Sequence, residues 1–260
     1  MFPNEPAETP MDLRFWLFGT HVRVQPMFWL LSAVLGWGLV AGGGRTGLFY
    51  LGIWVVCVFV SVLLHEFGHV FMGRLFGSHG HIVLTSFGGL AIGSNALERG
   101  WQRFLVSFAG PLIQFALLGV TVLAMFILLP KVPKSWQEMA EVTFVSLIYI
   151  NLVWPIINLL PIWPLDGGQM AREVFAAVAP RNGTTITLVV SACTAGLMAF
   201  CCVFPEVVAV YIPVLQNMGR QIFMAFFFGM LGVQSLMALP AATPTRRIHH
   251  ENDDEFPWER

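Results

Sequence analysis

Long uncharged stretches alternate with short polar segments along the whole chain. A helix needs about 20 predominantly apolar residues to cross the ~30 Å hydrocarbon core of a bilayer. Six stretches reach or approach this length: 24–44, 46–64, 104–130, 142–165, 184–205 and 221–245. The pattern predicts a polytopic membrane protein with about six transmembrane helices. Residues 207–219 are also apolar, but they are too few to assign as a further span.

Two short segments have the pattern of extended chain rather than helix. They are THVRV at 20–24 and HIVLTSFGGLAIGS at 81–94. The second consists of an apolar run, the pair Gly88 and Gly89 as a turn, and another apolar run, which is the pattern of a hairpin. Non-helical backbone beside a membrane core is tolerated only where it lines a cavity or is buried in protein. We therefore predict an all-α membrane fold with a short membrane-associated β-hairpin.

The fourth apolar stretch ends in a segment that should not remain helical. Pro161 and Pro164 each lack a backbone N–H and disfavour helix in the residue before them. The glycines at 167–168 permit close backbone approach before a fresh helix at 169–178. We therefore expect the chain to turn into the helix bundle at Asp166.

The polar ends divide the chain into three segments. Residues 1–14 are polar and acidic, unlike the basic start of a cleaved signal peptide. Residues 15–240 are predicted to form one six-helix membrane domain. Residues 241–260 carry mixed charge without an apolar period, which predicts a disordered tail.

Composition and charge support a membrane protein and exclude several other classes. The chain is 56% hydrophobic and 11% charged, whereas soluble domains are about 25% charged. A net charge of -1 provides no basic field for nucleic acid. The four cysteines lie in apolar stretches without C-x-x-C spacing, which favours packing roles. If both termini lie on one side of the membrane, ten of the 14 Lys and Arg also lie there, so the positive-inside rule predicts cytoplasmic termini.

The second apolar stretch continues into the sequence HEFGH at 65–69, an H-E-x-x-H motif. Residues four apart share one face of a helix, so His65 and His69 can present their imidazoles to one metal ion. Glu66 is adjacent to the first of these ligands and can act as a general base. The pattern therefore predicts a zinc-hydrolase site.

The alternative is a chance grouping of polar residues at a helix end near the lipid headgroups. An ionisable residue at mid-bilayer costs about 2.5–3.5 kcal/mol on insertion scales, so three of them need a compensating role. That cost favours the metal site.

A zinc ion held by two histidines usually takes a third protein ligand. Asp12, Asp253 and Asp254 lie in the polar ends, whereas Asp166 follows a long uncharged stretch. An aspartate before a helix often serves only as its cap. Together with the H-E-x-x-H motif, however, Asp166 is the expected third ligand.

These motifs in combination resemble the site-2 protease family of intramembrane zinc metalloproteases. HEFGH in an apolar helix is followed at 158–168 by the pattern N-x-x-P-x-x-P-L-D-G-G. SFAGP at 107–111 is similar to the Gly-Pro segment of the family's third core helix, and SFGGLA at 86–91 is similar to its glycine-bearing hairpin. Members of the family often have Asn three residues after the Gly-Pro pair, where this chain has Gln114.

The resemblance implies a three-helix catalytic core, here at about 46–76, 104–130 and 142–165. It implies one Zn²⁺ per chain, held by His65, His69 and Asp166, with Glu66 as the catalytic base. Asn158 matches the family's asparagine, which helps to place the substrate carbonyl or to stabilise its oxyanion.

The expected reaction is hydrolysis of a peptide bond within or near a transmembrane segment of another membrane protein, as in regulated intramembrane proteolysis. By family analogy the expected location is a prokaryotic inner membrane. The alternative is a metal-binding membrane protein without proteolysis, such as a transporter or a silent regulator. Both would use His65 and His69, but only a protease needs Glu66.

Overall fold

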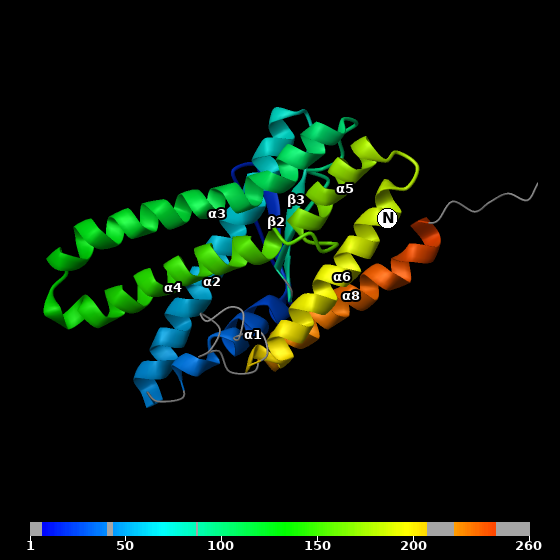
Figure 1. Cartoon of the computed structure of the whole chain (residues 1–260). Helices are drawn as coiled ribbons and strands as arrows, with labels where there is room; N and C mark the ends of the chain where they lie inside the picture. The colour runs from blue at the N-terminus through cyan, green and yellow to red at the C-terminus, as the bar shows by residue number, and fades with distance from the viewer. Residues whose placement is uncertain (1–6, 41–43, 87, 207–220, 243–260) are drawn as a thin grey trace, which may run out of the picture.

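The computed structural model describes residues 7–40, 44–86, 88–206 and 221–242 (Figure 1). The short piece at 207–219 and the tail from 243 lie outside the described residues, so the predictions for them stay untested. The described part is mostly helical with one small sheet. Its elements are β1 Leu13–Leu17, β2 Thr20–Val24, α1 Pro26–Leu35, α2 Gly44–Leu75, β3 His81–Thr85, β4 Gly88–Ile92, α3 Gly100–Leu128, α4 Lys134–Asn158, α5 Asp166–Val178, α6 Gly183–Val203 and α8 Ile222–Ala242, with short 3-10 turns at Trp37–Leu39 and Leu129–Lys131.

Five helices among the described residues are long and apolar enough to cross a membrane: α2, α3 with its terminal turn, α4, α6 and α8. The stretch at 24–44 was expected to be a sixth. It forms instead the ten-residue helix α1 and a 3-10 turn, too short to span.

α1 ends where it packs closely against α2. Gly36 ends α1 beside the indole of Trp54, where a Cβ would lie only 2.7 Å from Nε1. The same indole nitrogen donates a hydrogen bond to the Ser32 carbonyl at 3.0 Å. Apolar residues of this stretch therefore pack on α2 as well as facing outward, so the apolar run alone did not show that this stretch spans the membrane.

The strands form one four-stranded sheet in the order β1-β2-β3-β4. The predicted hairpin is present as β3 and β4, and the predicted extended segment is β2. The glycine pair is not the turn, because Gly88 and Gly89 are the first residues of β4. β1 was not predicted, and neither was the parallel pairing of β2 with β3.

The sheet is anchored on the last turns of α2. Val22, Ile82 and Leu84 are fully buried, and they belong to one core with Phe67 and Val70 of α2. This packing places β4, an outer strand of the sheet, beside the same face of α2 that carries the H-E-x-x-H motif.

Helices α2, α3 and α4 pack together as the expected three-helix core. α2 and α3 approach closely at Gly68, where a Cβ would lie 3.0 Å from the Cα of Gly110. Small residues at such a crossing let two membrane helices touch through their backbones. α6 and α8 form a second pair, and α5 packs between α6 and α3 (Figure 1).

The predicted break in the fourth helix is present, but the helix stops earlier than expected. α4 ends at Asn158 rather than at 165, and α5 begins at Asp166 rather than at 169. Pro161 cannot donate the next helical hydrogen bond, so the chain turns before the second proline. Gly168 allows the close return, because a Cβ there would lie 2.6 Å from the Trp163 nitrogen.

Candidate metal centre

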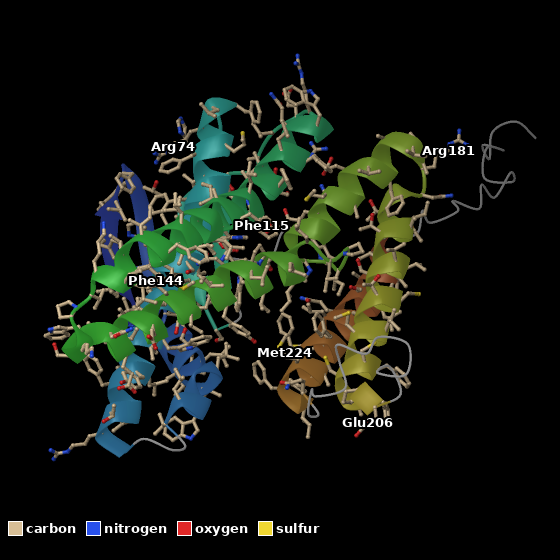
Figure 2. All side chains as sticks on the ribbon, turned by 60° about the vertical axis from the view of Figure 1, so that its left-hand side comes forward. Arg74, Phe115, Phe144, Arg181, Glu206 and Met224 are labelled. Carbon is tan, nitrogen blue, oxygen red and sulfur yellow. The ribbon has the colours of Figure 1, made fainter. Side chains whose placement is uncertain are left out.

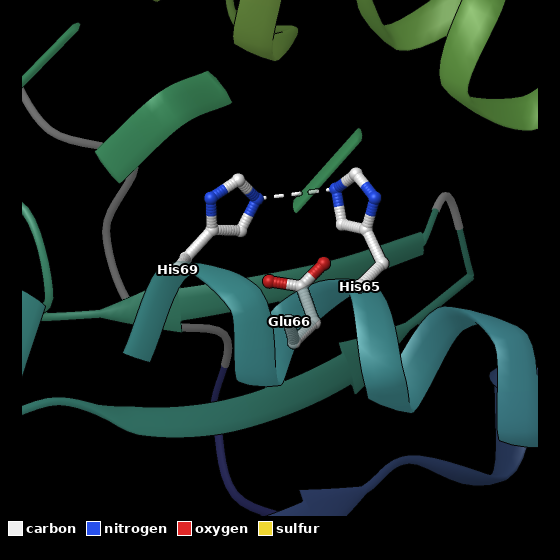
Figure 3. Close-up of side chains that lie close together, drawn as sticks. All are labelled: His65, Glu66 and His69. Carbon is white, nitrogen blue, oxygen red and sulfur yellow. Dashed lines mark hydrogen bonds between the residues drawn. The ribbon is translucent and has the colours of Figure 1, made fainter. Parts of the chain in front are cut away.

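His65, Glu66 and His69 lie together on α2, and all three are buried. One possible ligand atom from each lies within 4.8 Å of the others. Figure 3 shows the two imidazoles facing each other, with the Glu66 carboxylate close to both. Among the described residues this is the group of histidine and acidic side chains that could hold a metal ion.

The turn after α4 brings Asp166 to the same point. Its Oδ2 lies 3.0 Å from His65 Nε2, and its Oδ1 lies 3.3 Å from His69 Nε2. Asp166 is 8% exposed and is the first residue of α5. His65 and His69 are far from Asp166 in the sequence but close to it in space, as the sequence motifs predicted.

Hydrogen bonds on the far side of each ring fix the two histidine tautomers. His65 Nδ1 lies 2.8 Å from Gln114 Oε1, and His69 Nδ1 lies 2.7 Å from the carbonyl oxygen of Val106. A carbonyl oxygen can only accept, so each Nδ1 carries a proton and donates it. In the neutral imidazoles, both Nε2 atoms therefore point lone pairs toward Asp166.

This arrangement fits a cation. The two Nε2 atoms are 3.1 Å apart, and two lone pairs at that distance repel each other. Asp166 Oδ2 accepts no hydrogen bond from the described residues although it is buried. Two imidazole nitrogens and a carboxylate oxygen form a common protein ligand set for catalytic zinc. The cluster is therefore suited to one zinc ion.

A glycine keeps the space around these ligands open. A Cβ at Gly110, on α3, would lie 2.7 Å from His65 Nε2 and closer still to His69 Nε2. Real Cβ atoms do not approach so closely, so alanine would push against both imidazoles. The Gly-Pro segment thus lets α3 pass directly beside the candidate metal ligands.

Glu66 lies against β4 rather than in open space. The backbone of Ala91 hydrogen-bonds its carboxylate, and the Cα of Gly89 faces its side chain so closely that a Cβ would overlap it. The glycine at the start of β4 therefore serves close approach to Glu66. The strand fixes the position of this carboxylate beside the two histidines.

Asn158 also reaches the centre from the end of α4. Its Nδ2 lies 3.5 Å from His65 Nε2, which is at the long limit of a hydrogen bond. The amide is therefore held loosely and could turn toward another acceptor. All five residues singled out in the sequence lie around one point.

Gln114 is a candidate supporting residue that the sequence argument treated only as a departure from the family pattern. It is fully buried on α3, and its amide oxygen orients the ring of His65. A partner on the second ring nitrogen fixes both tautomer and ring direction in metal-binding histidines. The signal available in the sequence was a lone amide in an otherwise apolar stretch.

Gln114→Leu should lower zinc affinity by roughly 10- to 100-fold, the usual cost of losing such a partner. Competition with a zinc-sensitive dye would measure it. Thr121→Val is the matched control, because Thr121 is buried two turns further along α3 and bonds only the Leu117 carbonyl of its own helix. Equal affinities for Gln114→Leu and the parent would show that His65 needs no such partner.

The centre opens into a cavity of about 570 Å³. His65, Glu66, His69 and Asp166 line it, together with most of β4. Trp154 and Asn158 of α4 and Phe227, Met230, Leu231 and Gln234 of α8 form further parts of its wall. The candidate metal ligands are thus accessible from a space large enough for several residues of another chain.

Comparison with known proteins supports the resemblance seen in the motifs. The model of peptidase family M50 matches residues 127–200, which include Asn158 and Asp166. Stage IV sporulation protein FB of Bacillus subtilis is 30% identical over 61% of this chain and 49% of its own length. A zinc metalloprotease of Methanocaldococcus jannaschii is 26% identical over 62% of this chain and 44% of its own length. The chain therefore spans less than half of each of these two relatives.

The fold has a solved counterpart in a site-2 protease from Methanocaldococcus jannaschii. The two agree with a TM-score of 0.55 at 23% identity, over 86% of this chain and 94% of that one. Together with the five apolar helices, these likenesses indicate an integral membrane protein. Residues 127–200 are thus similar in sequence to peptidase family M50, and the chain is similar in fold to a site-2 protease.

Proposed function

We propose that this protein is an intramembrane zinc metalloprotease that hydrolyses a peptide bond within or near a transmembrane segment of another membrane protein. His65, His69 and Asp166 would hold one zinc ion, with Glu66 as the general base and Asn158 beside the substrate carbonyl. The single observation that carries the proposal is a buried carboxylate, Glu66, fixed next to two tautomer-locked imidazoles in a cavity of peptide size.

A zinc ion in such a site supplies a Lewis acid that polarises the peptide carbonyl and makes water acidic enough to be deprotonated near neutral pH. Glu66 takes a proton from the attacking water and passes it to the leaving amine as the C–N bond breaks. Asn158 can donate from Nδ2 to the carbonyl oxygen as negative charge develops there. One water is consumed, and a new carboxylate and a new amine are formed.

A metal-binding protein without proteolysis, such as a transporter or silent regulator, is the second candidate. It would need the two histidines but not a carboxylate held beside them. Glu66 is buried in an apolar helix, where an ionisable group is costly and marks function. Its fixed position against β4 favours the protease.

The proposed partner is a membrane protein that presents a transmembrane segment, and the proposed location is a prokaryotic cell membrane. Figure 2 shows Arg74 and Arg181 at one end of the molecule and Glu206 at the other. By the positive-inside rule, the arginine end would face the cytoplasm. Cytoplasmic placement of both chain termini stays a prediction.

The test is cleavage of a single-span test protein reconstituted with the purified protease in lipid vesicles. A new fragment should form over time, stop after metal removal by 1,10-phenanthroline, and return when Zn²⁺ is restored. Gel separation and mass spectrometry would locate the cut. Cleavage that persists without metal would contradict the proposal, as would bound zinc with no cleavage across a panel of transmembrane segments.

A further inference from the structure

Helix α8 contributes one of its faces to the wall of the cavity that contains the candidate metal ligands. Phe227, Met230 and Gln234 of α8 all line this cavity, and their spacing of three and four positions places them on one side of the helix. α8 packs on α6, whereas β4 packs on α2, so the helix and the strand form separate parts of the wall. An occupant of the cavity would therefore meet side chains of α8 along one side.

Gln234 is the polar residue on this otherwise apolar face. The other polar side chain of α8, Ser235, is buried and donates a hydrogen bond to the Leu231 carbonyl oxygen at 2.9 Å. Gln234 is exposed instead, and no hydrogen bond in the described part of the chain involves its side chain. Polar side chains on membrane-spanning helices are costly and mark functional positions. The Gln234 amide is thus accessible at the cavity and has both its donor and its acceptor available.

Packing holds this part of α8 beside the turn that leads into Asp166. Leu231 of α8 and Ile162 of the turn belong to one buried core, and Leu165 packs against it. Leu165, Asp166 and Gln234 all line the same cavity. Gln234 therefore faces the space next to the candidate metal centre without belonging to its ligands.

Filling the cavity would change the surroundings of the Gln234 amide. A bound segment would exclude water from it, and an amide that loses water without gaining a partner costs free energy. α8 cannot supply that partner from its backbone, because helical N–H and C=O groups bond to one another. A site that presents a hydrogen-bonding group discriminates against an occupant that leaves this group unpaired. The occupant must therefore place a hydrogen-bonding group opposite Gln234 or bind less tightly.

We propose that Gln234 is a specificity-determining residue that selects substrate segments with a hydrogen-bonding side chain, such as that of Asn, Gln, Ser or Thr, opposite α8. Phe227 and Met230 on the same face suit apolar side chains of the segment, so the group in register with Gln234 should also be a side chain. The substrate class is thus a transmembrane segment that is apolar except for one polar residue near the cleaved bond. The inference rests on the proposed function, because it takes the occupant of the cavity to be such a segment.

Zinc-binding hydroxamates test this selection without a known substrate. Acetohydroxamate reaches only the metal, whereas two longer probes carry three leucines, one on the amino side and one on the carboxyl side. Phe227 and Gln234 are about 10 Å apart along the helix axis, which is about the length of three extended residues. In each longer probe, Asn replaces one leucine at a time, because its side chain is polar and similar in shape to that of leucine. Calorimetric titration of the zinc-loaded protein would measure each affinity.

The Gln234→Met variant removes the amide and keeps the length of the side chain. At one position of one series, the affinity for the Asn probe relative to the all-leucine probe should be roughly 3- to 10-fold higher in the parent than in Gln234→Met, the range for one hydrogen bond. The all-leucine probes should bind Gln234→Met at least as tightly as the parent, because they then bury no unpaired amide. Acetohydroxamate should bind both proteins equally.

Gln137→Met is the matched control, because this exposed amide lies on α4 outside the cavity wall. It should leave the relative affinity for every Asn probe at the parent value. A change in Gln137→Met equal to that in Gln234→Met would overturn the assignment to the cavity.

The remaining outcomes separate this inference from the proposed function. Equal relative affinities in the parent and Gln234→Met at every Asn position would overturn the selection. Weaker binding of the all-leucine probes to Gln234→Met would overturn it as well, since the amide would then bind the main chain. A loss that includes acetohydroxamate would show a distorted metal site and likewise overturn it. Failure of acetohydroxamate to bind the zinc-treated parent would instead count against the metal site itself, and with it the proposed function.

Discussion

The Glu66→Gln variant should bind zinc like the parent and cleave the vesicle-bound test protein at least about 100-fold more slowly, because general-base catalysis contributes about 10²- to 10⁴-fold. Glutamine has nearly the shape of glutamate, so the side chain can keep its place between the histidines and β4. Its amide cannot take a proton from water. Initial rates of fragment formation, with bound zinc measured by elemental analysis of the same samples, would provide both readouts.

Glu141→Gln is the matched control for this change. Glu141 is exposed on α4 and is not part of the cavity wall, so the same loss of one carboxylate there should leave cleavage unchanged. Cleavage by Glu66→Gln at the parent rate would remove Glu66 from the mechanism. Loss of zinc in Glu66→Gln would instead make Glu66 a metal ligand, a role that its distance from both histidines permits.

The parts of the fold that sequence predicted best are those set by helix periodicity and by rare residue types. The spacing of His65 and His69 requires only that α2 be helical, which its uninterrupted apolar run ensured. The prolines after α4 predicted the turn that brings Asp166 to the histidines. Both features depend on residues close together in the sequence, so they can be predicted without knowing how the helices pack.

Other features depend on contacts between distant segments and were predicted poorly. The stretch at 24–44 is apolar enough for a span, yet α1 ends where Gly36 meets Trp54 of another helix. β1 consists of LRFWL, an apolar run with one arginine, and only its pairing with β2 makes it a strand. Neither contact can be predicted from the residues of the segment alone.

The residues that contact the candidate metal ligands also depend on packing between distant segments, so they were predicted poorly. Gln114 and Gly110 act on the histidines across the interface between α2 and α3, so their roles follow from helix packing that the sequence does not specify. The hydrogen bond from Asn95 Nδ2 to Gln169 Oε1 joins two residues that are 74 positions apart in the sequence. Motifs thus predicted the candidate reacting groups, and the structure was needed to find the side chains that contact them.

Asp166→Asn should reduce zinc affinity by more than the roughly 100-fold upper range expected for Gln114→Leu, because it removes a direct ligand rather than an orienting partner. The carboxamide has almost the same volume, and its Nδ2 can donate to the Nε2 lone pairs of His65 and His69 that the metal would otherwise satisfy. The metal-free variant should therefore stay folded, with an unfolding temperature close to that of the metal-free parent. Zinc titration with a chromophoric competitor would measure the affinity, and thermal unfolding in detergent would check the fold.

Asn158→Ala provides the contrast. Asn158 is the last residue of α4, whereas Asp166 is the first residue of α5, and Asn158 Nδ2 lies 3.5 Å from the same His65 nitrogen. If it acts on the substrate carbonyl, its removal should slow cleavage while zinc affinity stays at the parent value. Parent-like zinc affinity in Asp166→Asn would show that the carboxylate is not a ligand and would leave Glu66 as the other acid beside the two histidines in the described part of the chain. Because each ligand set predicts a different pair of losses, the two variants together decide which acid completes the metal site and which group serves the reaction.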